Sequence, residues 1–447
     1  MNRRYLRGDQ SLVREINLST VLRYLHHDAP LSRAGLANLT GLNKTTVSSL
    51  VEELLGWGLI HEVGLDTSSG GRPATLLDLD PEAGCIIGVA LGVDFVSVVL
   101  SDFAGQILWR RLQETDPAES QDRTIQSTLQ IVDQAMGVGR SRGTRLLGLG
   151  LATPGTVNVK EGLLIFSPNL QWYYVPYRKI FQAHTGLPVI VDNDANAAAQ
   201  AEHLFGVARN AQNFVSVFAG VGVGGGLFLN GELYRGAGGY AGEIGHTNFM
   251  VEAYRRPCRC GSRGCWETSI AQDSVVERVR GRLSVGRNSL VSRLMAEQGS
   301  PLTLPLIVQA ADANDAETME ALAETGSLMG LGVSNLVSIL NPEMVVIGGP
   351  LSIAGKYLLP PIEQAVADTT LPEIGQQVQI LLSAFGADAS VMGAVALVVE
   401  SILTDPSSVE RFSGMSASDA KGGESKLESS AKQMRGDRLA GGSPLRL

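Results

Sequence analysis

Three of the four cysteines in this chain fall within eight positions, in the stretch CRCGSRGCWE at 258–267. Together with one histidine upstream they form the pattern H-x11-C-x-C-x4-C, made by His246, Cys258, Cys260 and Cys265. Three thiolates and one imidazole are a complete tetrahedral ligand set for Zn²⁺. Because four protein ligands leave no open position for water, the pattern predicts a structural zinc ion and not a hydrolytic one.

The alternative for this motif is a group of unligated buried thiols, with His246 close to them only in sequence. The spacing favours the metal, since Gly261 and Gly264 allow the chain to curl until three sulfur atoms converge. The fourth cysteine, Cys85, lies alone in an apolar segment, where we expect a buried core residue.

Composition and charge limit the class of protein. The chain has 447 residues, 44% of them hydrophobic, which predicts two or three domains of a globular protein. No apolar run approaches a membrane span of about 20 residues, and no secretory signal precedes the first helix, so we expect a cytoplasmic protein without a membrane partner. The net charge is −9, yet residues 1–50 carry seven basic and three acidic residues. A basic end on an acidic body is typical of a protein that contacts phosphates at that end only.

Residues 1–80 show the order of a winged helix-turn-helix domain. Apolar residues from Leu12 to Leu25, among them Ile16, recur at helical spacing over 12–28, and Pro30 ends that helix. Ser32 is suited to cap a short second helix, and Asn43 a third helix over 44–58. Two short strands around a Gly/Ser-rich turn follow at 59–79. In this motif the helix after the turn enters the major groove of double-stranded DNA.

Short polar and basic side chains gather where this domain would face DNA. The candidates are Ser32, Arg33, Asn43, Lys44, Thr45, Thr46, Ser48, Ser49 and, at the tip of the wing, Arg72. Such groups hydrogen-bond to phosphates and base edges. The alternative is a helical bundle with a polar face; the wing and the charge distribution favour DNA.

The rest of the chain predicts a larger α/β domain over 84–403. A strand–glycine turn–strand–turn–strand unit near 85–108 returns at 213–234, which suggests two related halves. A buried strand in LPVIVDND runs into the helix ANAAAQAEHLFG. From 404 to 447 the chain has many Ser, Gly, Lys and Glu residues and little to bury, so we expect a disordered tail there.

These motifs together resemble the ROK family, which groups repressors, sugar kinases and uncharacterised reading frames. The resemblance rests on GAGGYAGEIGHTNF at 236–249 followed by CRCGSRGCWE, and covers about 84–400. The N-terminal domain, ending in GGRPATLL, is similar to that of the family's regulators, among them repressors that respond to xylose, glucose or N-acetylglucosamine. The resemblance implies a two-lobed actin-like fold.

The resemblance also implies a ligand pocket for a sugar. The positions that match the family's sugar contacts are Asn169, Asn193, Asp194, Glu243, His246 and Glu267. Amides and carboxylates suit a ring of hydroxyls, because each makes directional hydrogen bonds. In a kinase of this family Asp194 would be the catalytic base. For Asn193 and Asp194 the alternative is a strand-end turn and a helix cap.

The phosphate loops of the kinases are altered in this chain. The first loop, D-x-G-x-T in the kinases, here contains Ala90, Val93 and Asp94, so a carboxylate and a hydroxyl are missing and a new negative charge has appeared. The second loop, normally with a threonine hydroxyl, here has Val221. Both changes count against ATP binding.

The sequence therefore favours a sugar-responsive transcriptional repressor of carbohydrate-utilisation genes that holds a structural zinc and does not phosphorylate its ligand. We expect a homodimer, or a tetramer, on a pseudo-palindromic operator. Two alternatives remain open at this point: an ATP-dependent sugar kinase with a DNA-binding domain, and a DNA-binding protein whose larger domain is only a dimerisation scaffold.

Overall fold

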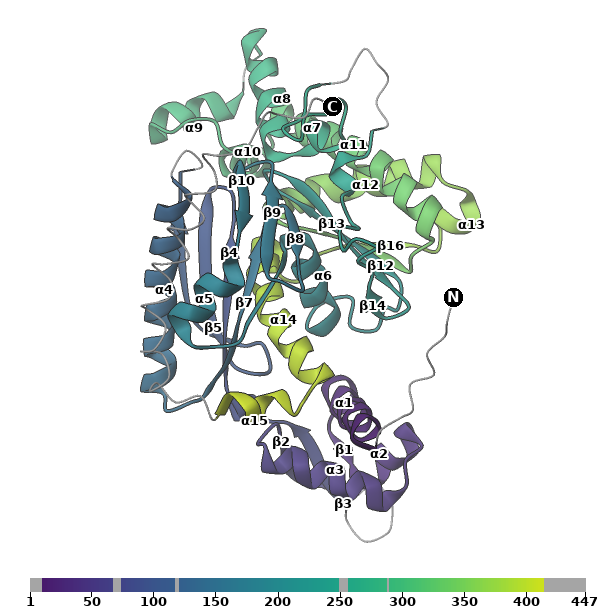
Figure 1. The fold of residues 1–447 in the computed structure, drawn as a ribbon. Helices are drawn as coiled ribbons and strands as arrows, with labels where there is room; N and C mark the ends of the chain where they lie inside the picture. The colour runs from purple at the N-terminus through teal and green to yellow at the C-terminus, as the bar shows by residue number, and fades with distance from the viewer. Residues whose placement is uncertain (1–9, 67–73, 117–119, 249–255, 288, 414–447) are drawn as a thin grey trace, which may run out of the picture.

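The computed structural model describes residues 10–66, 74–116, 120–248, 256–287 and 289–413. Figure 1 shows a small N-terminal unit below two larger lobes, each built on its own five-stranded sheet. We call residues 10–79 the head, and the two lobes the first and the second lobe in chain order. The predicted α/β architecture, with a head and two lobes, is confirmed.

The head contains three helices and a three-stranded sheet of order β1-β3-β2. Its elements are α1 (Gln10–Asp28), β1 (Leu31–Ser32), α2 (Arg33–Thr40), α3 (Lys44–Gly56), β2 (Ile60–Asp66) and β3 (Ala74–Leu79). Both predicted caps form: Ser32 Oγ accepts a hydrogen bond from Gly35 N at 3.1 Å, and Asn43 Oδ1 accepts one from Thr46 N at 2.8 Å. These caps satisfy N–H groups that the first helical turn leaves without partners.

Not all apolar residues of the predicted first helix are buried. Leu12 and Ile16 share the helical spacing of α1, yet Ile16 is 55% exposed, whereas Leu18, Val21, Leu22 and Leu25 are buried. The apolar positions of α1 extend over two faces, and the spacing alone could not tell which one α3 and the lobes would cover.

The first lobe is a mixed sheet of order β11-β7-β4-β5-β6. Its elements are β4 (Cys85–Leu91), β5 (Phe95–Ser101), β6 (Ile107–Glu114), α4 (Gln121–Ser141), β7 (Leu146–Thr153), β8 (Thr156–Asn158), β9 (Leu163–Ser167), β10 (Trp172–Val175), α5 (Tyr177–Thr185) and β11 (Val189–Asn193), preceded by the turn η1 (Pro81–Ala83). Strands β10-β9-β8 form a small sheet of their own. β4, β7 and β11 run parallel, so their carboxyl ends meet at one edge.

The second lobe repeats the predicted hairpin and has the sheet order β14-β13-β12-β15-β16. Its strands are β12 (Phe214–Ala219), β13 (Val223–Leu229), β14 (Glu232–Leu233), β15 (Met344–Gly348) and β16 (Gln379–Leu382). Its helices and turns are η2 (Ile244–His246), α7 (Glu267–Ile270), α8 (Gln272–Ser284), α9 (Leu290–Gln298), α10 (Leu304–Asp312), α11 (Ala316–Leu340), η4 (Pro350–Ala354), α12 (Gly355–Thr369) and α13 (Pro372–Gly375).

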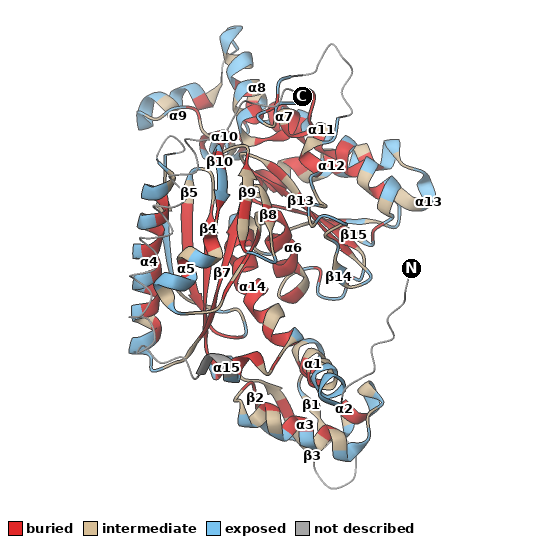
Figure 2. Ribbon diagram, viewed as in Figure 1, coloured by how far each residue is buried: buried red, intermediate tan, exposed pale blue. Residues whose placement is uncertain are grey.

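Two helices fill the space between the sheets: α6 (Asp194–Leu204) and α14 (Ala389–Thr404), the latter after the turn η5 (Gly386–Asp388). Glycines allow them to approach the strands closely. A Cβ on Gly150 of β7 would lie 1.8 Å from Ala394 O of α14, and one on Gly226 of β13 would lie 2.3 Å from Ala199 Cβ of α6. Figure 2 shows that both helices are buried over most of their length.

The head and the first lobe share a hydrophobic core. Leucines and valines of α1 and α3 belong to the same buried cluster as Val391, Val395, Ile402 and Leu403 of α14. Among the described residues, Gly386–Thr404 is the one segment long and apolar enough to cross a membrane, and 72% of it is buried inside the protein. Its apolar composition is therefore that of a core helix.

The predicted disordered tail at 404–447 falls mainly on 414–447, which lie outside the described residues. The first part of that segment contains α15 (Ser408–Ser413), and Val409 packs into the shared core of head and first lobe at 3% exposure. The expectation of disorder from 404 onwards is therefore wrong for this helix.

Candidate metal and ligand sites

The four predicted metal ligands lie together. The ligand atoms of His246, Cys258, Cys260 and Cys265 are all within 4.8 Å of one another. Cys260 Sγ lies 3.7 Å from Cys265 Sγ, and Cys258 Sγ lies 3.8 Å from His246 Nδ1. A tetrahedral zinc with Zn–S bonds of about 2.3 Å separates two sulfur ligands by about 3.8 Å. The cluster therefore has the composition and size of a site that could hold a metal ion.

Burial of the thiols affects their ability to bind a metal ion. Burial raises the pKa of Cys258 and of Cys265 above that of an ordinary thiol. A metal ligand must be a thiolate, so the protein by itself opposes the ligating form of both groups. A bound cation lowers the pKa of its thiol ligands and so favours the thiolate. Metal binding is therefore accompanied by proton release and is coupled to folding.

The chain around the cluster is shaped by two left-handed glycines, Gly261 at φ 92° and Gly264 at φ 78°. Cys258 N donates to Ser262 O at 2.8 Å and closes the turn. An isolated bridge joins Asn248 to Cys265, so the last cysteine is held next to the segment that carries His246. Residues 249–255 between them lie outside the described part of the chain.

A cavity of about 710 Å³ lies between the two lobes. All six side chains predicted for sugar binding line it: Asn169, Asn193, Asp194, Glu243, His246 and Glu267. They come from both lobes, from the segment after β9, from the carboxyl end of β11 with the start of α6, and from η2 and α7. In open α/β sheets, ligands bind outside the carboxyl ends of the strands.

Asn193 forms the helix cap that was the alternative to a sugar contact, and it also lines the cavity. It is the N-cap of α6, and its Oδ1 accepts from Ala195 N and Asn196 N. Its Nδ2 donates to Gly155 O at 3.0 Å, which leaves one N–H of this amide for a ligand. Its Oδ1 already accepts two hydrogen bonds from the first turn of α6.

Asp194 is a carboxylate with strongly altered acidity. Burial raises its pKa to about 6, and the negative charge of Glu243 acts in the same direction. Burial also raises the pKa of Glu243. Two acidic groups that oppose each other's charge in one cavity are well placed to accept hydrogen bonds from neutral hydroxyls and poorly placed to receive a phosphate.

The metal cluster and the cavity share side chains. His246 offers Nδ1 to the cluster, and its Nε2 lies 3.9 Å from Glu243 Oε2. Glu267, only 8% exposed, accepts a hydrogen bond from Val223 N at 2.9 Å, and its Oε1 lies 3.5 Å from Cys258 Sγ. The segment that holds the metal ligands therefore also fixes two carboxylates of the cavity.

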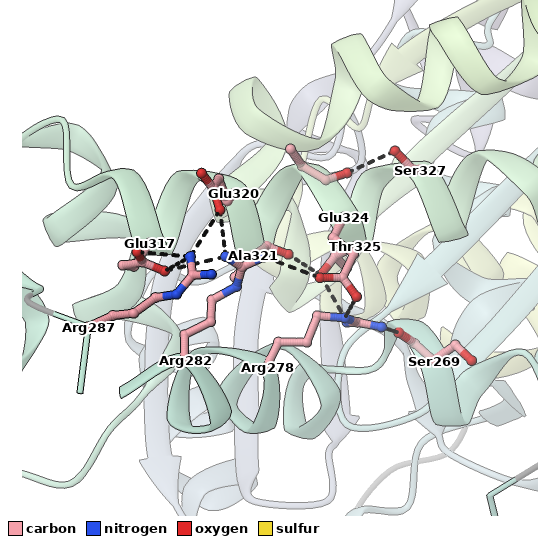
Figure 3. A network of polar contacts seen from close by, with 11 residues as sticks. Ser269, Arg278, Arg282, Arg287, Glu317, Glu320, Ala321, Glu324, Thr325 and Ser327 are labelled. Atoms are coloured by element: carbon pink, nitrogen blue, oxygen red, sulfur yellow. Dashed lines mark hydrogen bonds and ion pairs between the residues drawn. The ribbon is translucent and has the colours of Figure 1, made fainter. Parts of the chain in front are cut away.

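A network of charged residues holds the neighbouring helices in place (Figure 3). Arg278 of α8 donates to Ser269 O of α7 at 2.5 Å and to Thr325 Oγ1 of α11 at 3.0 Å. Arg282 donates to Glu320 at 2.6 Å and pairs with Glu317 at 3.3 Å. The network ties α7, and with it Glu267, to the long helix α11.

Two arginines near the cavity were not among the predicted site residues. Arg259, between the first two cysteines, donates to Asn169 Oδ1 at 3.2 Å and pairs with Asp273 at 3.2 Å. Arg235 pairs at 2.6 Å with the buried Asp192, directly before Asn193. Arg259 could have been predicted from the sequence, because it lies inside the cysteine motif. The Arg235–Asp192 pair could not, because it joins segments that are distant in the sequence.

A model of the ROK family matches residues 86–401. The chain belongs to the ROK family. The xylose repressor of Caldicellulosiruptor bescii is 32% identical over 402 residues, which is 89% of this chain and 99% of that protein. A crystal structure of a ROK family transcriptional regulator, a homologue of the Escherichia coli Mlc protein, superposes with a TM-score of 0.76 at 26% identity, covering 89% of this chain and 99% of the other.

A ROK glucokinase from Streptomyces griseus, solved with glucose and AMPPNP, is also similar in structure. Its TM-score is 0.61 at 28% identity, and it covers 70% of this chain and 98% of its own. The two-lobed body is thus shared with an enzyme of the family, whereas the similarity to the regulator extends further along the chain.

In this ROK protein the residues that replace the first phosphate loop surround the end of β4. Ala90, the last but one residue of β4, has a buried side chain, and Val93 and Asp94 line the cavity. The ring of Phe95 packs against Gly92, where a Cβ would lie 2.3 Å from a ring carbon. Burial raises the pKa of Asp94. Val221 lies opposite, in the tight turn closed by Gly220 N and Gly222 O at 2.9 Å.

The head of this ROK protein presents part of the predicted DNA face to solvent. Asn43, Lys44, Thr45 and Ser49 are exposed, and Ser32, Thr46 and Ser48 are half-buried. Arg33 differs from the others because its guanidinium pairs with Glu52 at 2.8 Å and with Glu62 at 3.2 Å. Arg72 lies outside the described residues.

Proposed function

We propose that this protein is a sugar-responsive transcriptional repressor of carbohydrate-utilisation genes. The similarity to the xylose repressor spans 402 residues, more than 86–401 can supply, so it must include much of the head. The head has the helix order and the exposed polar helix α3 of a major-groove reader. A DNA-binding head on a ligand-binding body is the arrangement a regulator needs, and such a protein would act in the cytoplasm.

The observation that carries the sugar part of the proposal is the convergence of all six predicted polar side chains in one cavity. Amides and carboxylates from both lobes surround the same space, with Asp194 and Glu243 at its polar end. A polyol bound there would contact both lobes and favour one arrangement of them. We propose an aldose or amino sugar as the effector, with xylose as the first candidate because of the relative's name.

We further propose that the metal is zinc with a structural role. Four protein ligands are present, so no coordination position remains for a substrate or water. Bound there, the ion would supply the positive charge that keeps the thiols deprotonated. The residues themselves fix the positions of His246 and Glu267 at the cavity wall.

We propose that the repressor binds its operator as a homodimer or a dimer of dimers. A pseudo-palindromic site of two half-sites requires two heads at a fixed spacing. On the exposed face of α3, the contacts would come chiefly from Asn43, Lys44, Thr45 and Ser49, with Thr46 and Ser48 beside them, and from Arg72 of the wing.

The test is fluorescence anisotropy of the full-length protein on DNA from its own upstream region, at fixed salt. Salt must be constant because phosphate contacts make the affinity strongly salt-dependent. We expect tight binding that one sugar from a panel of aldoses and amino sugars changes at least about fivefold. If the protein shows no preference for this DNA over an unrelated duplex, the regulator proposal is wrong.

A kinase is the second candidate, because Asp194 occupies the cavity at the start of α6, where the catalytic base of the family would lie. Asp94 and Phe95 at the first phosphate loop oppose a nucleotide. An ATP-coupled phosphorylation assay separates the two: a kinase forms sugar phosphate and loses this activity in Asp194→Asn, whereas the repressor forms none. A mere scaffold would show no calorimetric heat with any sugar.

A further inference from the structure

Helix α14 reaches from the cavity to the head. At its first turn, Ser390 and Val391 line the cavity, together with Ala387 and Asp388 of the turn before it. At its last turn, Leu403 O accepts a hydrogen bond from Ser19 Oγ of α1 at 2.7 Å. In Figure 1 the helix descends from between the sheets to end beside α1. The fourteen residues from Ser390 to Leu403 span about 20 Å at the rise of an α-helix.

Glu400 lies where three elements meet near the end of α14. Arg23 of α1 donates to its two carboxylate oxygens at 3.2 and 2.5 Å, and also to Thr404 Oγ1 at 2.8 Å. Gln200 of α6 donates to the same carboxylate at 3.5 Å. Because α6 begins at Asp194, Glu400 contacts the head on one side and, on the other, the helix whose first residue lines the cavity.

Near the cavity, α14 packs closely against both of its neighbours. A Cβ on Gly393 would lie 2.2 Å from the carbonyl carbon of Ala197 in α6, and one on Gly88 of β4 would lie 2.8 Å from Val391 O. The helix is therefore in contact with backbone on both sides. Protein interiors packed to this density transmit a displacement and do not absorb it. Glu400 and Leu403 lie on the same helix as these closely packed residues, at its other end.

A second contact holds the head to the body near α6. Arg209, a few residues after the end of α6, donates to His26 O at the end of α1, at 3.0 Å. The head is thus attached at the far ends of both helices that begin at the cavity, α6 and α14. Either helix can change the orientation of α1 when the lobes move.

We propose that Glu400 is a positioning residue that couples the cavity to the DNA-binding head through α14. The inference rests on the proposed function and adds the route by which the ligand acts. Closure of the lobes around a sugar moves α14 together with the strands it packs against, and the Glu400–Arg23 pair carries that movement to α1. The spacing of two heads in a dimer then changes, and the ligand acts in proportion to its preference for one arrangement.

The pair is suited to orientation more than to stability. The side chains of Arg23 and Glu400 are 41% and 30% exposed, and ion pairs of this kind add little to the free energy of unfolding. Variants at Glu400 should therefore fold, because the buried face of α14 is untouched. That makes the coupling measurable apart from stability.

The experiment compares full-length wild type with Glu400→Ala, Glu400→Gln and the charge exchange Arg23→Glu/Glu400→Arg. Asp312→Asn is the matched control, since it breaks the exposed Lys356–Asp312 pair of 2.8 Å between α10 and α12. DNA affinity is measured by anisotropy with and without D-xylose, D-glucose and N-acetyl-D-glucosamine, and sugar affinity by calorimetry. We expect the sugar-dependent change in DNA affinity to fall at least about fivefold in both single variants.

Calorimetric sugar affinity should stay within about twofold of wild type in the single variants, because no cavity residue changes. The charge exchange should recover part of the coupling, and the control should retain all of it. An unchanged sugar effect in Glu400→Ala overturns the inference. So does a joint loss of sugar affinity and melting temperature that the exchange does not rescue. If no sugar affects wild type on DNA, the proposed function itself fails and the coupling with it.

Discussion

His246 and Glu243 face each other across the boundary between the metal cluster and the cavity, with Nε2 and Oε2 3.9 Å apart. The other ring nitrogen, Nδ1, lies 3.8 Å from Cys258 Sγ. One imidazole thus joins the two sites. A metal on Nδ1 fixes the ring and leaves Nε2–H to interact with the carboxylate or a ligand, as in metal sites where the second nitrogen orients the histidine.

Loss of the metal should therefore weaken sugar binding as well as the fold. Cys260→Ser removes one of four ligands, and structural zinc sites contribute their binding energy to folding. We expect less than one zinc per chain by elemental analysis, a melting temperature lower by about 10 °C, and loss of the calorimetric sugar signal. Cys85→Ala is the matched control, because it removes a buried cysteine outside the cluster. Full zinc content in Cys260→Ser would contradict the ligand assignment.

Asp194→Asn should stabilise the fold while it abolishes sugar binding. Burial raises the pKa of Asp194 to about 6, so folding favours the protonated acid. The stability that this preference gives is present below the unfolded pKa of about 3.9 and is lost as the pH rises through 6. At pH 7.5 the variant should melt a few degrees above wild type, and at pH 4 the two should coincide. Thermal unfolding at both pH values measures the gain in stability, and calorimetric titration with the sugar measures the loss of binding.

Acid should loosen the contact between head and body. Burial lowers the pKa of His26 to about 4, and the charge of Arg209 adds to the effect. A depressed histidine pKa gives stability that is present above the unfolded value of about 6.5 and is lost as the pH falls towards 4. We expect hydrogen exchange of α1 to accelerate over this interval, after correction for intrinsic rates.

His26→Gln should show a flatter pH dependence of that exchange, because the titrating group is gone. Burial also lowers the pKa of the nearby His203. The exchange rate of a double variant with His203→Gln should therefore depend on pH even less. His184→Gln, on the first lobe, serves as the control. A slope in His26→Gln equal to that of wild type would assign the effect to other groups.

Lys44 and Arg33 should differ in their effect on DNA binding, although the sequence proposed both as contacts. Lys44 is exposed at the start of α3, whereas Arg33 pairs with Glu52 and Glu62. Lys44→Ala should reduce the slope of log affinity against log salt by about 1. Arg33→Ala should leave that slope unchanged and lower the free energy of unfolding by about 1 kcal/mol. The slopes are measured by fluorescence anisotropy at four salt concentrations. A reduced slope of log affinity against log salt in Arg33→Ala would show that this side chain reaches a phosphate.

The sequence alone determined the features that depend on local chemistry. Ser32 and Asn43 cap their helices because a short side-chain oxygen can reach the first free N–H groups. The cysteine spacing brings three sulfurs together through two glycine turns, and the strand–glycine turn–strand units predicted both sheets. The polar residues of the cavity were identified by their match to the motifs of the ROK family.

Only the tertiary structure decided how these parts act on one another. The faces of α1 that are buried, the pairing of Arg33 with Glu52, and the contact of Arg259 with Asn169 depend on which surfaces pack together. The meeting of Arg23 with Glu400 joins residues at opposite ends of the chain. Periodicity and motifs describe residues a few positions apart, whereas these contacts depend on the packing of α14 between two sheets and the head.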